Sequence, residues 1–452
     1  MKWRVLAVED GNGGAVLAWE ENRGRKVCCR DTRDIYAQRL DVAGASKWGI
    51  GDVRVAAEEA GEELLGMLPE GEGGAFLLWH RSGDLVIDFL DGSGIGRYGN
   101  GGKVIHSSPA STEWNPLNGF DRSPSADRGL VAWTEQEPDA EAGVHVLPLD
   151  RREGAWTAGN PGIAVGGKDL HGAAVAACAG KRWFLCYWSN SGSGAELRGL
   201  WLSQGGSAIG RPFRIARDDT KRFMHAEAFG DGAGAAFVAW ASADPDALGR
   251  SHNLHVAHVR RTKGGRTDVE DSAAGEARTM ALHITPTLIH VEGSGEVPAT
   301  PDFVAWRRTS SFVPTAPGAG LVGAIDGEGL NVRFVGCRGR RIVVSEPVPA
   351  ARPANGGLAP VWVPAGDGRW LLLWGEKRER GVIMGRLVRV TGSAPVLEGE
   401  PFDVAGEATG GPRLEASVAL SGGGAVLAWA AVRPSDSGLV RAQKIFLREG
   451  AK

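Results

Sequence analysis

Residues 94 to 99 match the Gly-x-Gly-x-x-Gly pattern with which many proteins bind the pyrophosphate of a dinucleotide; they read Gly94-Ile95-Gly96-Arg97-Tyr98-Gly99. In a dinucleotide site this pattern leads from a strand into a helix, whose N-terminus receives the phosphates. No helical periodicity follows residue 99, and the neighbouring residues are also rich in glycine. We therefore predict a turn between two strands and no nucleotide cofactor.

Three histidines, His252, His255 and His258, are close enough in sequence to suggest a metal site. Side chains alternate between the two faces of a strand, so His255 and His258 would point in opposite directions. The acidic pairs at 218–219 and 244–246 lack the regular spacing of oxygen ligands in a calcium loop. The sequence therefore predicts no metal site, and we expect no cofactor.

Several carboxylates lie in polar segments of variable length and could serve acid–base chemistry, namely Glu20, Glu21, Glu135, Glu137 and Glu376. A glycosidase needs two such groups facing each other across roughly 5 to 9.5 Å. Walker A, nucleophile-elbow and HExxH motifs are absent from the chain. Because sequence does not show which carboxylates converge, we name no catalytic residue.

The composition excludes several classes of protein. The 452 residues include 51 Lys and Arg against 54 Asp and Glu, a net charge of -3, so we expect no nucleic-acid partner. No run approaches 18 apolar residues, so we expect no membrane insertion. The N-terminus lacks a secretory signal, and five cysteines do not suggest a disulfide framework. We therefore expect a cytoplasmic protein by default, with export by a non-classical route left open.

A repeat organises the chain. Short apolar runs that end in tryptophan recur at intervals of 52 to 68 residues, closing at Trp19, Trp79, Trp133, Trp188, Trp240, Trp306, Trp374 and Trp429. A glycine-rich turn precedes most of these runs, and further strand-like runs follow them. Each unit is thus predicted to contain about four short strands, A to D, joined by turns. Only residues 58–68 could support a helical turn.

Eight units of four antiparallel strands predict an all-β protein with a single β-propeller domain over residues 1–452, or seven blades if one unit is degenerate. A β-solenoid typically has a shorter period and no hairpin turn in every unit. The last unit stops without a clear fourth strand. The expected units are 1–57, 58–110, 111–167, 168–219, 220–275, 276–350, 351–408 and 409–452.

The tryptophans have two interpretations. Each repeated tryptophan closes an apolar strand at the same register, so we expect it to fill the space between neighbouring sheets. The alternative is an aromatic ring that binds sugars. The tryptophans outside this register, chiefly Trp48, Trp114 and Trp156, are better candidates for a surface role.

The segment from Asp34 to Gly49, which contains Tyr36-Ala37-Gln38-Arg39, follows the run Gly14-Ala15-Val16-Leu17-Ala18-Trp19. Together they resemble the tryptophan-rich repeats of bacterial β-propeller proteins. The match is good in the first unit and fades in the others. The resemblance implies the propeller fold and a tendency to bind, with no particular reaction, and its relatives are mostly extracellular or surface modules.

Strands that alternate in direction place the B–C and D–A connections on one face of a propeller. These connections vary in length and are polar, and such loops on a rigid scaffold usually carry binding function. Aromatic and arginine side chains dominate binding hot spots, so we predict contacts at Trp114, Arg307, Arg308 and Phe312.

The leading functional hypothesis is a non-catalytic propeller that binds a protein partner or acts as an assembly scaffold. A carbohydrate-binding propeller with a glycan ligand is the alternative. A glycoside hydrolase or lyase with carboxylates in the central channel is the second alternative. One broad apolar patch on the structure would favour a protein partner over both.

Overall fold

The computed structural model describes residues 2–21, 26–27, 30–31, 33–49, 51–58, 61–99, 101–107, 120–122, 127–135, 143–152, 155–167, 170–179, 182–191, 194–243, 252–261, 267–269, 280–284, 310–326, 329–338, 341–351, 358–377, 381–406, 412–419, 425–431 and 439–445. Strands dominate these residues, and none of them forms a helix. Accordingly, no helix among them is long and apolar enough to cross a membrane.

Eight antiparallel sheets, which we call blades one to eight, follow one another along the described chain. Blades one to four contain β1 (Lys2–Glu9), β2 (Ala15–Glu21), β5 (Asp34–Leu40) and β6 (Val53–Ala56); β7 (Glu62–Pro69), β8 (Ala75–Arg81), β9 (Asp84–Leu90) and β10 (Lys103–Ser107); β11 (Phe120–Arg122), β12 (Arg128–Glu135), β13 (Gly143–Arg152), β14 (Ala155–Ala158) and β15 (Gly162–Gly166); and β16 (Leu170–Cys178), β17 (Arg182–Ser191), β18 (Gly194–Ser203) and β19 (Ala208–Asp218).

Blades five to eight contain β20 (Arg222–Gly230), β21 (Ala236–Ala243), β22 (His252–Arg261), β23 (Thr267–Val269) and β24 (Met280–Ile284); β25 (Ser310–Ala316), β26 (Ala319–Asp326), β27 (Gly329–Arg338), β28 (Arg341–Val344) and β29 (Val348–Ala351); β30 (Leu358–Gly366), β31 (Arg369–Lys377), β32 (Gly381–Thr391) and β33 (Ala394–Gly406); and β34 (Pro412–Ala419), β35 (Ala425–Ala431) and β36 (Leu439–Ile445). Between β2 and β5, β3 (Lys26–Val27) and β4 (Arg30–Asp31) form a separate two-stranded ribbon.

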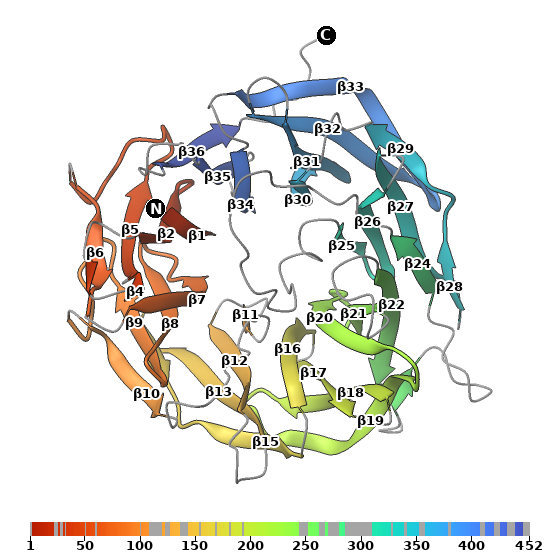
Figure 1. The fold of residues 1–452 in the computed structure, drawn as a ribbon, viewed down its shortest axis with the longest axis horizontal. Coiled ribbons are helices and arrows are strands. Elements are labelled where there is room, and N and C mark those ends of the chain that lie inside the picture. Colours follow the sequence, from red (N-terminus) through yellow and green to blue (C-terminus); the bar gives the residue numbers. More distant parts are fainter. Residues whose placement is uncertain are drawn as a thin grey trace.

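The blades surround a central axis, with the first strand of each blade nearest the centre and the last at the rim (Figure 1). β1 of blade one packs against β34 and β35 of blade eight, so the ring closes between two sheets. Within the described residues blade eight has three strands, one fewer than blade one. The prediction of an all-β propeller with eight blades is therefore confirmed.

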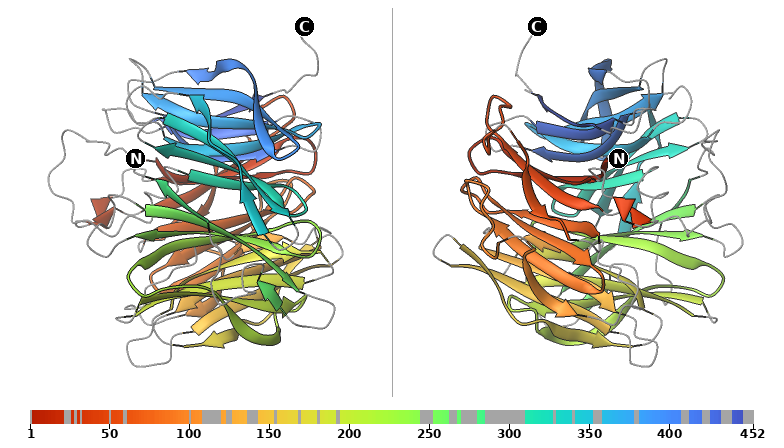
Figure 2. Two further views of the ribbon diagram at one scale, coloured as in Figure 1. Left: turned by 90° about the vertical axis from the view of Figure 1, so that its right-hand side faces the viewer. Right: turned by 60° about the vertical axis from the view of Figure 1, so that its left-hand side comes forward.

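The strands run across the thickness of the ring, so their connections emerge on two opposite faces (Figure 2). We call the side with the A–B and C–D connections the turn face, and the side with the B–C and D–A connections the loop face. The A–B connections are short, from the two residues between β30 and β31 to the five between β1 and β2. The connections on the loop face vary far more, as the sequence indicated.

The repeated tryptophans form the core. Where the structure describes their side chains they are at most 4% exposed, namely Trp19, Trp79, Trp133, Trp188, Trp240 and Trp374. Trp306 and the side chain of Trp429 lie outside the described part. Five of these rings lie in core clusters shared by two neighbouring sheets, and Trp19 packs within blade one. The prediction of a core role is confirmed for these six, and they offer no sugar-binding platform.

Glycine makes room for these rings. A Cβ atom at Gly102 would lie 2.3 Å from the Trp79 ring, and one at Gly172 would lie 2.2 Å from the Trp188 ring. Real side chains do not make contacts this short. Tryptophan rings therefore pack against glycine residues, and this packing accounts for part of the abundance of tryptophan and of glycine in the chain.

Three details of the predicted repeat were wrong. Residues 62–69 form β7 rather than a helical turn, because their apolar side chains pack against two neighbouring sheets. Blade five continues past residue 275, since β24 pairs with β22. The second strand of blade six is β26, which lacks tryptophan, whereas we had expected the run 303–306, which lies outside the described residues.

Candidate interaction surface and buried polar sites

Of the four residues predicted to contact a partner, the structure describes only one. Trp114, Arg307 and Arg308 lie outside the described residues. Phe312 lies in β25 and is only 6% exposed. Its ring centre is 5.1 Å from that of Phe229 and 5.2 Å from that of Phe237, both in blade five. The prediction that Phe312 is a surface contact was therefore wrong, because alternation along β25 turns this ring into the core between two blades.

The tryptophans outside the repeat register are also structural. Trp48 is 9% exposed, and its indole N–H donates to the carbonyl of Gly92 at 3.0 Å. Trp156 is 1% exposed, and its indole donates to the carbonyl of Pro69 at 3.3 Å. Each bond joins neighbouring blades, so the expected surface role is wrong for both, while Trp114 lies outside the described residues.

Three of the five loop-face carboxylates that the sequence suggested for catalysis form hydrogen bonds within the fold. Glu20, 1% exposed, accepts the backbone N–H of Leu64 at 2.9 Å and pairs with Arg33 at 2.9 Å. Glu21 accepts the indole N–H of Trp19, and Glu376 accepts that of Trp374. Glu135 and Glu137 lie outside the described side chains. Glu20 thus fixes the start of β7 in blade two to the end of β2 in blade one.

Glu62, which the sequence analysis missed, is the most perturbed acid on this face. Burial, and to a lesser degree the charge of Asp34, raises the pKa of Glu62 to about 7. Its Oε1 accepts the backbone N–H of Glu58 at 2.7 Å, while its buried Oε2 has no hydrogen-bond partner. This carboxyl can therefore hold or release a proton near neutral pH.

Asp34 is the second buried acid of this group. It is 4% exposed, its Oδ2 accepts the Tyr36 hydroxyl at 3.2 Å, and its Oδ1 has no hydrogen-bond partner. Within the described part of the chain, no three histidine, cysteine, aspartate or glutamate side chains converge as metal ligands. Asp34 also lies 3.6 Å from the guanidinium of Arg54, so of the two acids only Glu62, with its raised pKa, is a candidate for proton chemistry. The sequence did contain an indication of Glu62, because charged residues directly precede the apolar run 64–68.

The histidines of β22 point to opposite sides, as the sequence predicted. His255 stacks on Trp240 with ring centres 5.0 Å apart, and its Nε2 lies 2.7 Å from the Ser242 hydroxyl. Burial lowers the pKa of His255 to about 4, so the ring is neutral at physiological pH. His258 lies on the opposite side of the sheet, which faces blade six, and packs on Phe237 of its own blade.

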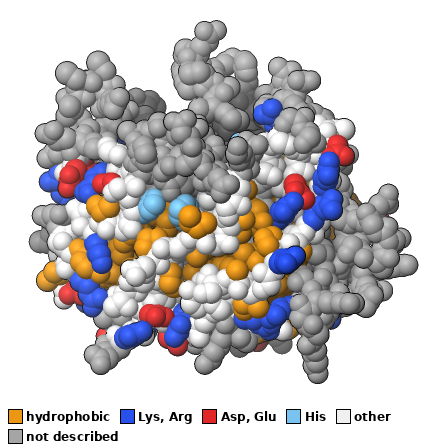
Figure 3. Space-filling view, turned by 90° about the horizontal axis from the view of Figure 1, so that it is seen from below, with side chains coloured by type: hydrophobic (Ala, Val, Ile, Leu, Met, Phe, Trp, Pro, Cys, Tyr) orange, Lys and Arg blue, Asp and Glu red, His pale blue; other side chains and the backbone are white. Residues whose placement is uncertain are grey.

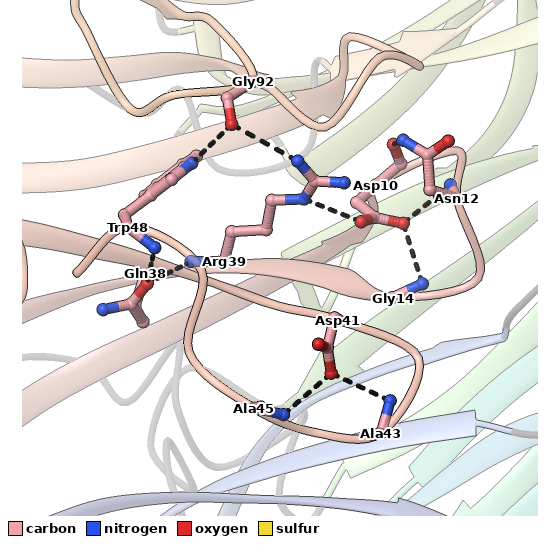
Figure 4. Close-up of polar contacts among 10 residues, drawn as sticks. All are labelled: Asp10, Asn12, Gly14, Gln38, Arg39, Asp41, Ala43, Ala45, Trp48 and Gly92. Atoms are coloured by element: carbon pink, nitrogen blue, oxygen red, sulfur yellow. Dashed lines mark hydrogen bonds and ion pairs between the residues drawn. The ribbon is translucent and has the colours of Figure 1, made fainter. Parts of the chain in front are cut away.

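On the turn face, an ion pair within blade one and a hydrogen bond from the same arginine to blade two form a joint that we call the first clasp (Figure 4). Oδ1 of Asp10 accepts the backbone N–H groups of Asn12 and Gly14, each at 2.8 Å. Oδ2 of Asp10 accepts Nε–H of Arg39 at 2.8 Å, and the guanidinium also donates to the carbonyl of Gly92 at 3.3 Å. The aspartate therefore shapes its own turn while Arg39 reaches the next blade.

Blade five repeats this arrangement with another cation, which we call the second clasp. Oδ1 of Asp231 accepts the backbone N–H groups of Ala233 and Ala235 at 2.8 and 2.9 Å. Oδ2 of Asp231 lies 3.1 Å from Nε2 of His258. His258 pairs with Phe237 in the sheet just as Arg39 pairs with Val16, so the two cations occupy equivalent positions.

The sequence 94–99 forms the predicted turn on this same face. The backbone N–H of Gly94 donates to the carbonyl of Asp91 at 2.9 Å, and Oδ1 of Asp91 accepts the N–H groups of Ser93 and Ile95. The following strand is β10, so no helix N-terminus is available for a pyrophosphate. The glycines therefore serve a tight turn.

An apolar band crosses the rim where β10, β15 and β19 form the outer strands of three successive blades (Figure 3). Ile163 in β15 is 68% exposed and Val104 in β10 is 39% exposed. Ile105, Ala164 and Val165 beside them are half-buried. We call this surface the rim band; the sequence analysis did not identify it because its residues resemble those of any outer strand.

No protein-family profile matches the chain, and no curated protein matches it. The similar solved structures include an ulvan lyase of a polysaccharide lyase family, with 9% identity over 98% of this chain and 91% of that one and a TM-score of 0.49. A Hadza microbial sialidase shares 13% identity over 98% and 92%, with a TM-score of 0.40.

The WD40 domain of SCAP from fission yeast shares 11% identity over 99% of this chain and 96% of that one, with a TM-score of 0.44. These neighbours differ in function while matching nearly the whole length of the chain. The propeller fold is defined by the sheet order of the chain itself, and these likenesses carry no argument about activity.

Proposed function

We propose that this protein is a non-catalytic β-propeller that binds a protein partner through the rim band. The observation that carries this proposal is the exposure of Ile163 and Val104, 68% and 39% respectively, on the outer strands of two successive blades. Large apolar side chains gathered on an otherwise polar surface are typical of protein interaction sites. The loop face adds connections of variable length to the surface that is available for binding.

The geometry of β15 indicates the form of the partner. β15 pairs with β13 on one side and, among the described residues, has no strand on its other side. An open sheet edge binds an extended segment by adding a strand, with alternate side chains entering apolar sites. The partner therefore supplies an extended segment with apolar residues at alternate positions.

Charge at the two ends of the rim band adds a second requirement. Lys103 in β10 and Arg211 in β19 are exposed and form no ion pair within the described part of the chain. Acidic residues that flank the apolar segment of the partner would meet these cations. The occupant we propose is thus an extended apolar segment with acidic flanks.

Site-directed photocrosslinking in native cells tests the proposal. A photoreactive residue at position 163 should form an adduct with one protein, whereas the same residue at position 396 should not. Val396 in β33 is a matched control because it is 43% exposed on an outer strand on the opposite side of the ring (Figure 1). Equal adducts from both positions, or none from position 163, would overturn the proposal.

A second candidate is an acid–base enzyme, favoured by the near-neutral pKa of Glu62 at the entrance of the innermost strand β7. A hydrolase or lyase reaction would use Glu62 as the proton donor. Glu62→Gln would then abolish turnover of polysaccharide substrates. A variant that is active, or a wild-type protein that cleaves none of a broad panel, would dismiss this candidate.

A further inference from the structure

Two histidines from different blades lie together at the border of the rim band (Figure 3). His106 is in β10, the outer strand of blade two, and His145 is in β13 of blade three. Their ring centres are 5.4 Å apart, and the ring planes are inclined by 48°. Both side chains are half-buried, so each ring keeps part of its surface in contact with solvent.

A buried tryptophan supports both imidazoles. His145 pairs with Trp133 in the sheet and stacks on its indole, with ring centres 5.4 Å apart and planes inclined by 13°. The ring of His106 lies against the same indole, with ring centres 5.7 Å apart. Trp133 is fully buried between blades two and three. The core of the blade interface therefore sets the separation of the two histidines.

Nε2 of His145 borders the exposed apolar part of the rim band. A Cβ atom at Gly143 would lie 3.0 Å from this nitrogen and 3.7 Å from Cγ2 of Ile163. His145 and Ile163 are also paired across β13 and β15. A side chain at position 143 would press on the imidazole, so glycine there allows the observed position of the ring.

Blade five contains the same tryptophan–histidine stack in a different setting. His255 pairs with Trp240, and its ring lies 5.0 Å from the indole at an inclination of 11°. Nε2 of His255 lies 2.7 Å from the hydroxyl of Ser242. In blade five the ring thus contacts a hydroxyl of its own blade, whereas in blade three the neighbouring blade adds a second imidazole.

We infer that His106 and His145 together form a surface site for one divalent transition-metal ion such as Zn²⁺. Imidazole nitrogen is a preferred ligand of zinc, copper and nickel. Two imidazoles on one tetrahedral Zn²⁺, with Zn–N distances of about 2.0 to 2.1 Å, have ring centres about 5 Å apart, close to the separation of this pair.

Two further positions of a tetrahedral ion remain to be filled. Among the described residues, no third histidine, cysteine, aspartate or glutamate joins the pair as a ligand. Water therefore completes the coordination in the isolated protein, and a chelator should remove the ion readily. Binding of the ion does not require the partner proposed above.

Titration calorimetry of the full-length protein with Zn²⁺ tests this inference. The wild type should bind one more Zn²⁺ than the double variant His106→Gln/His145→Gln. Each single variant should weaken binding at this site at least about tenfold, because even losing a residue that only supports a metal ligand typically costs about 10- to 100-fold. His255→Gln, the matched change in blade five, should bind like the wild type.

Thermal unfolding gives a second readout. The two ligands come from different blades and meet only in the folded protein, so Zn²⁺ should raise the unfolding temperature of the wild type and of neither single variant. Mg²⁺ should have no such effect, since it prefers oxygen ligands.

Unfolding without metal checks that each variant folds. If His145→Gln does not fold, His106→Gln decides, since β10 is an outer strand. Equal zinc stoichiometry in the wild type and the folded histidine variants, or equal stabilisation by Mg²⁺, would overturn the inference.

Discussion

The first and second clasps are built to one plan, yet they differ in the chemistry of the cation. In both, an aspartate orders its own hairpin turn and binds a cation from the third strand of the blade. Arg39 carries a permanent charge and contacts a backbone carbonyl of blade two, while His258 has a pKa of about 9 and can lose its charge as the pH rises. The same position in a blade can therefore carry either a cation of permanent charge or one whose charge depends on pH.

Blade two shows what the position does without a cation. Glu70 occupies the place of the aspartate, and Phe89 stands opposite Phe76 where the other blades carry Arg39 or His258. Burial raises the pKa of Glu70, against the opposing charge of Arg151 from blade three. An acidic residue at the A–B turn is therefore shared by blades one, two and five, and its partner differs in each of them.

The largest effect should come from removing the anion of the first clasp. In Asp10→Ala, the largely buried Arg39 keeps its charge but loses its carboxylate, so we expect the free energy of unfolding to fall by about 3 kcal/mol. Asp231→Ala should cost less at pH 9.5, since His258 can become neutral there. Urea unfolding of both variants measures the difference. Equal losses at that pH would mean that the two clasps do not differ as described.

The pH dependence should separate the two clasps. The pKa of His258 is raised to about 9 from an ordinary 6.5, so its stabilisation is complete below pH 6.5 and disappears as the pH rises through 9. The cost of Asp231→Asn should therefore shrink by about 2 kcal/mol between pH 6 and pH 9.5. The cost of Asp10→Asn should stay constant over this range. Denaturant unfolding at several pH values measures both, and a parallel change in both variants would contradict the assignment.

Glu62 provides an uncompensated acid for comparison with the paired ones. Its pKa is about 7 in the fold against an ordinary 4.5, so its ionisation weakens the fold increasingly as the pH rises from 4.5 to 7. Glu62→Gln should raise the free energy of unfolding at pH 8 by about 1 kcal/mol or more. At pH 4 it should have little effect. Destabilisation at pH 8 would show that the ionised carboxylate is stabilised by its surroundings.

The smallest effect concerns the geometry of the first clasp. Arg39→Lys keeps the positive charge near Asp10 but cannot donate to the carboxylate and to Gly92 in the same fork-like way. We expect a loss of about 1 kcal/mol in the free energy of unfolding. Trp48 continues to donate to Gly92 in this variant. A loss as large as that of Asp10→Ala would mean that the shape of the cation, rather than its charge, holds the blades together.

The sequence predicted the ring well because one strong signal recurs in it. A tryptophan on the second strand is buried in six of the blades where the structure describes it, so the spacing of these residues indicated the number of blades. The signal failed in blade six, where β26 ends without tryptophan. The prediction of a helical turn at residues 58–68 was wrong for a different reason. The apolar residues of β7 pack against two sheets at once, so they do not alternate with polar residues as in most strands.

The polar sites were largely beyond prediction because they depend on contacts between blades. Phe312 follows a polar segment and looks like a loop residue until β25 is paired. Glu20 looks like a loop acid until Leu64 of the next blade is placed beside it. Arg39 of blade one and Gly92 of blade two are far apart in sequence and meet only across two sheets. In contrast, the opposite orientation of His255 and His258 followed from alternation alone and is confirmed.

These joints and the rim band have complementary roles in the proposed function. The clasps and the buried tryptophans fix the sheets to one another, and a rigid outer edge binds an added segment without a further ordering cost. Exposed Ile163 and Val104 then supply the apolar contacts. The binding proposal is therefore a claim about one side of the ring.

The affinity of the purified protein for the partner captured from position 163 tests this claim most directly. We expect Ile163→Asp and Val104→Asp to raise the dissociation constant at least about tenfold, because an aspartate would be buried in an apolar contact. Val396→Asp, with similar exposure on the opposite side of the ring, should leave it unchanged. Equal affinities for all three variants and the wild type would contradict the account.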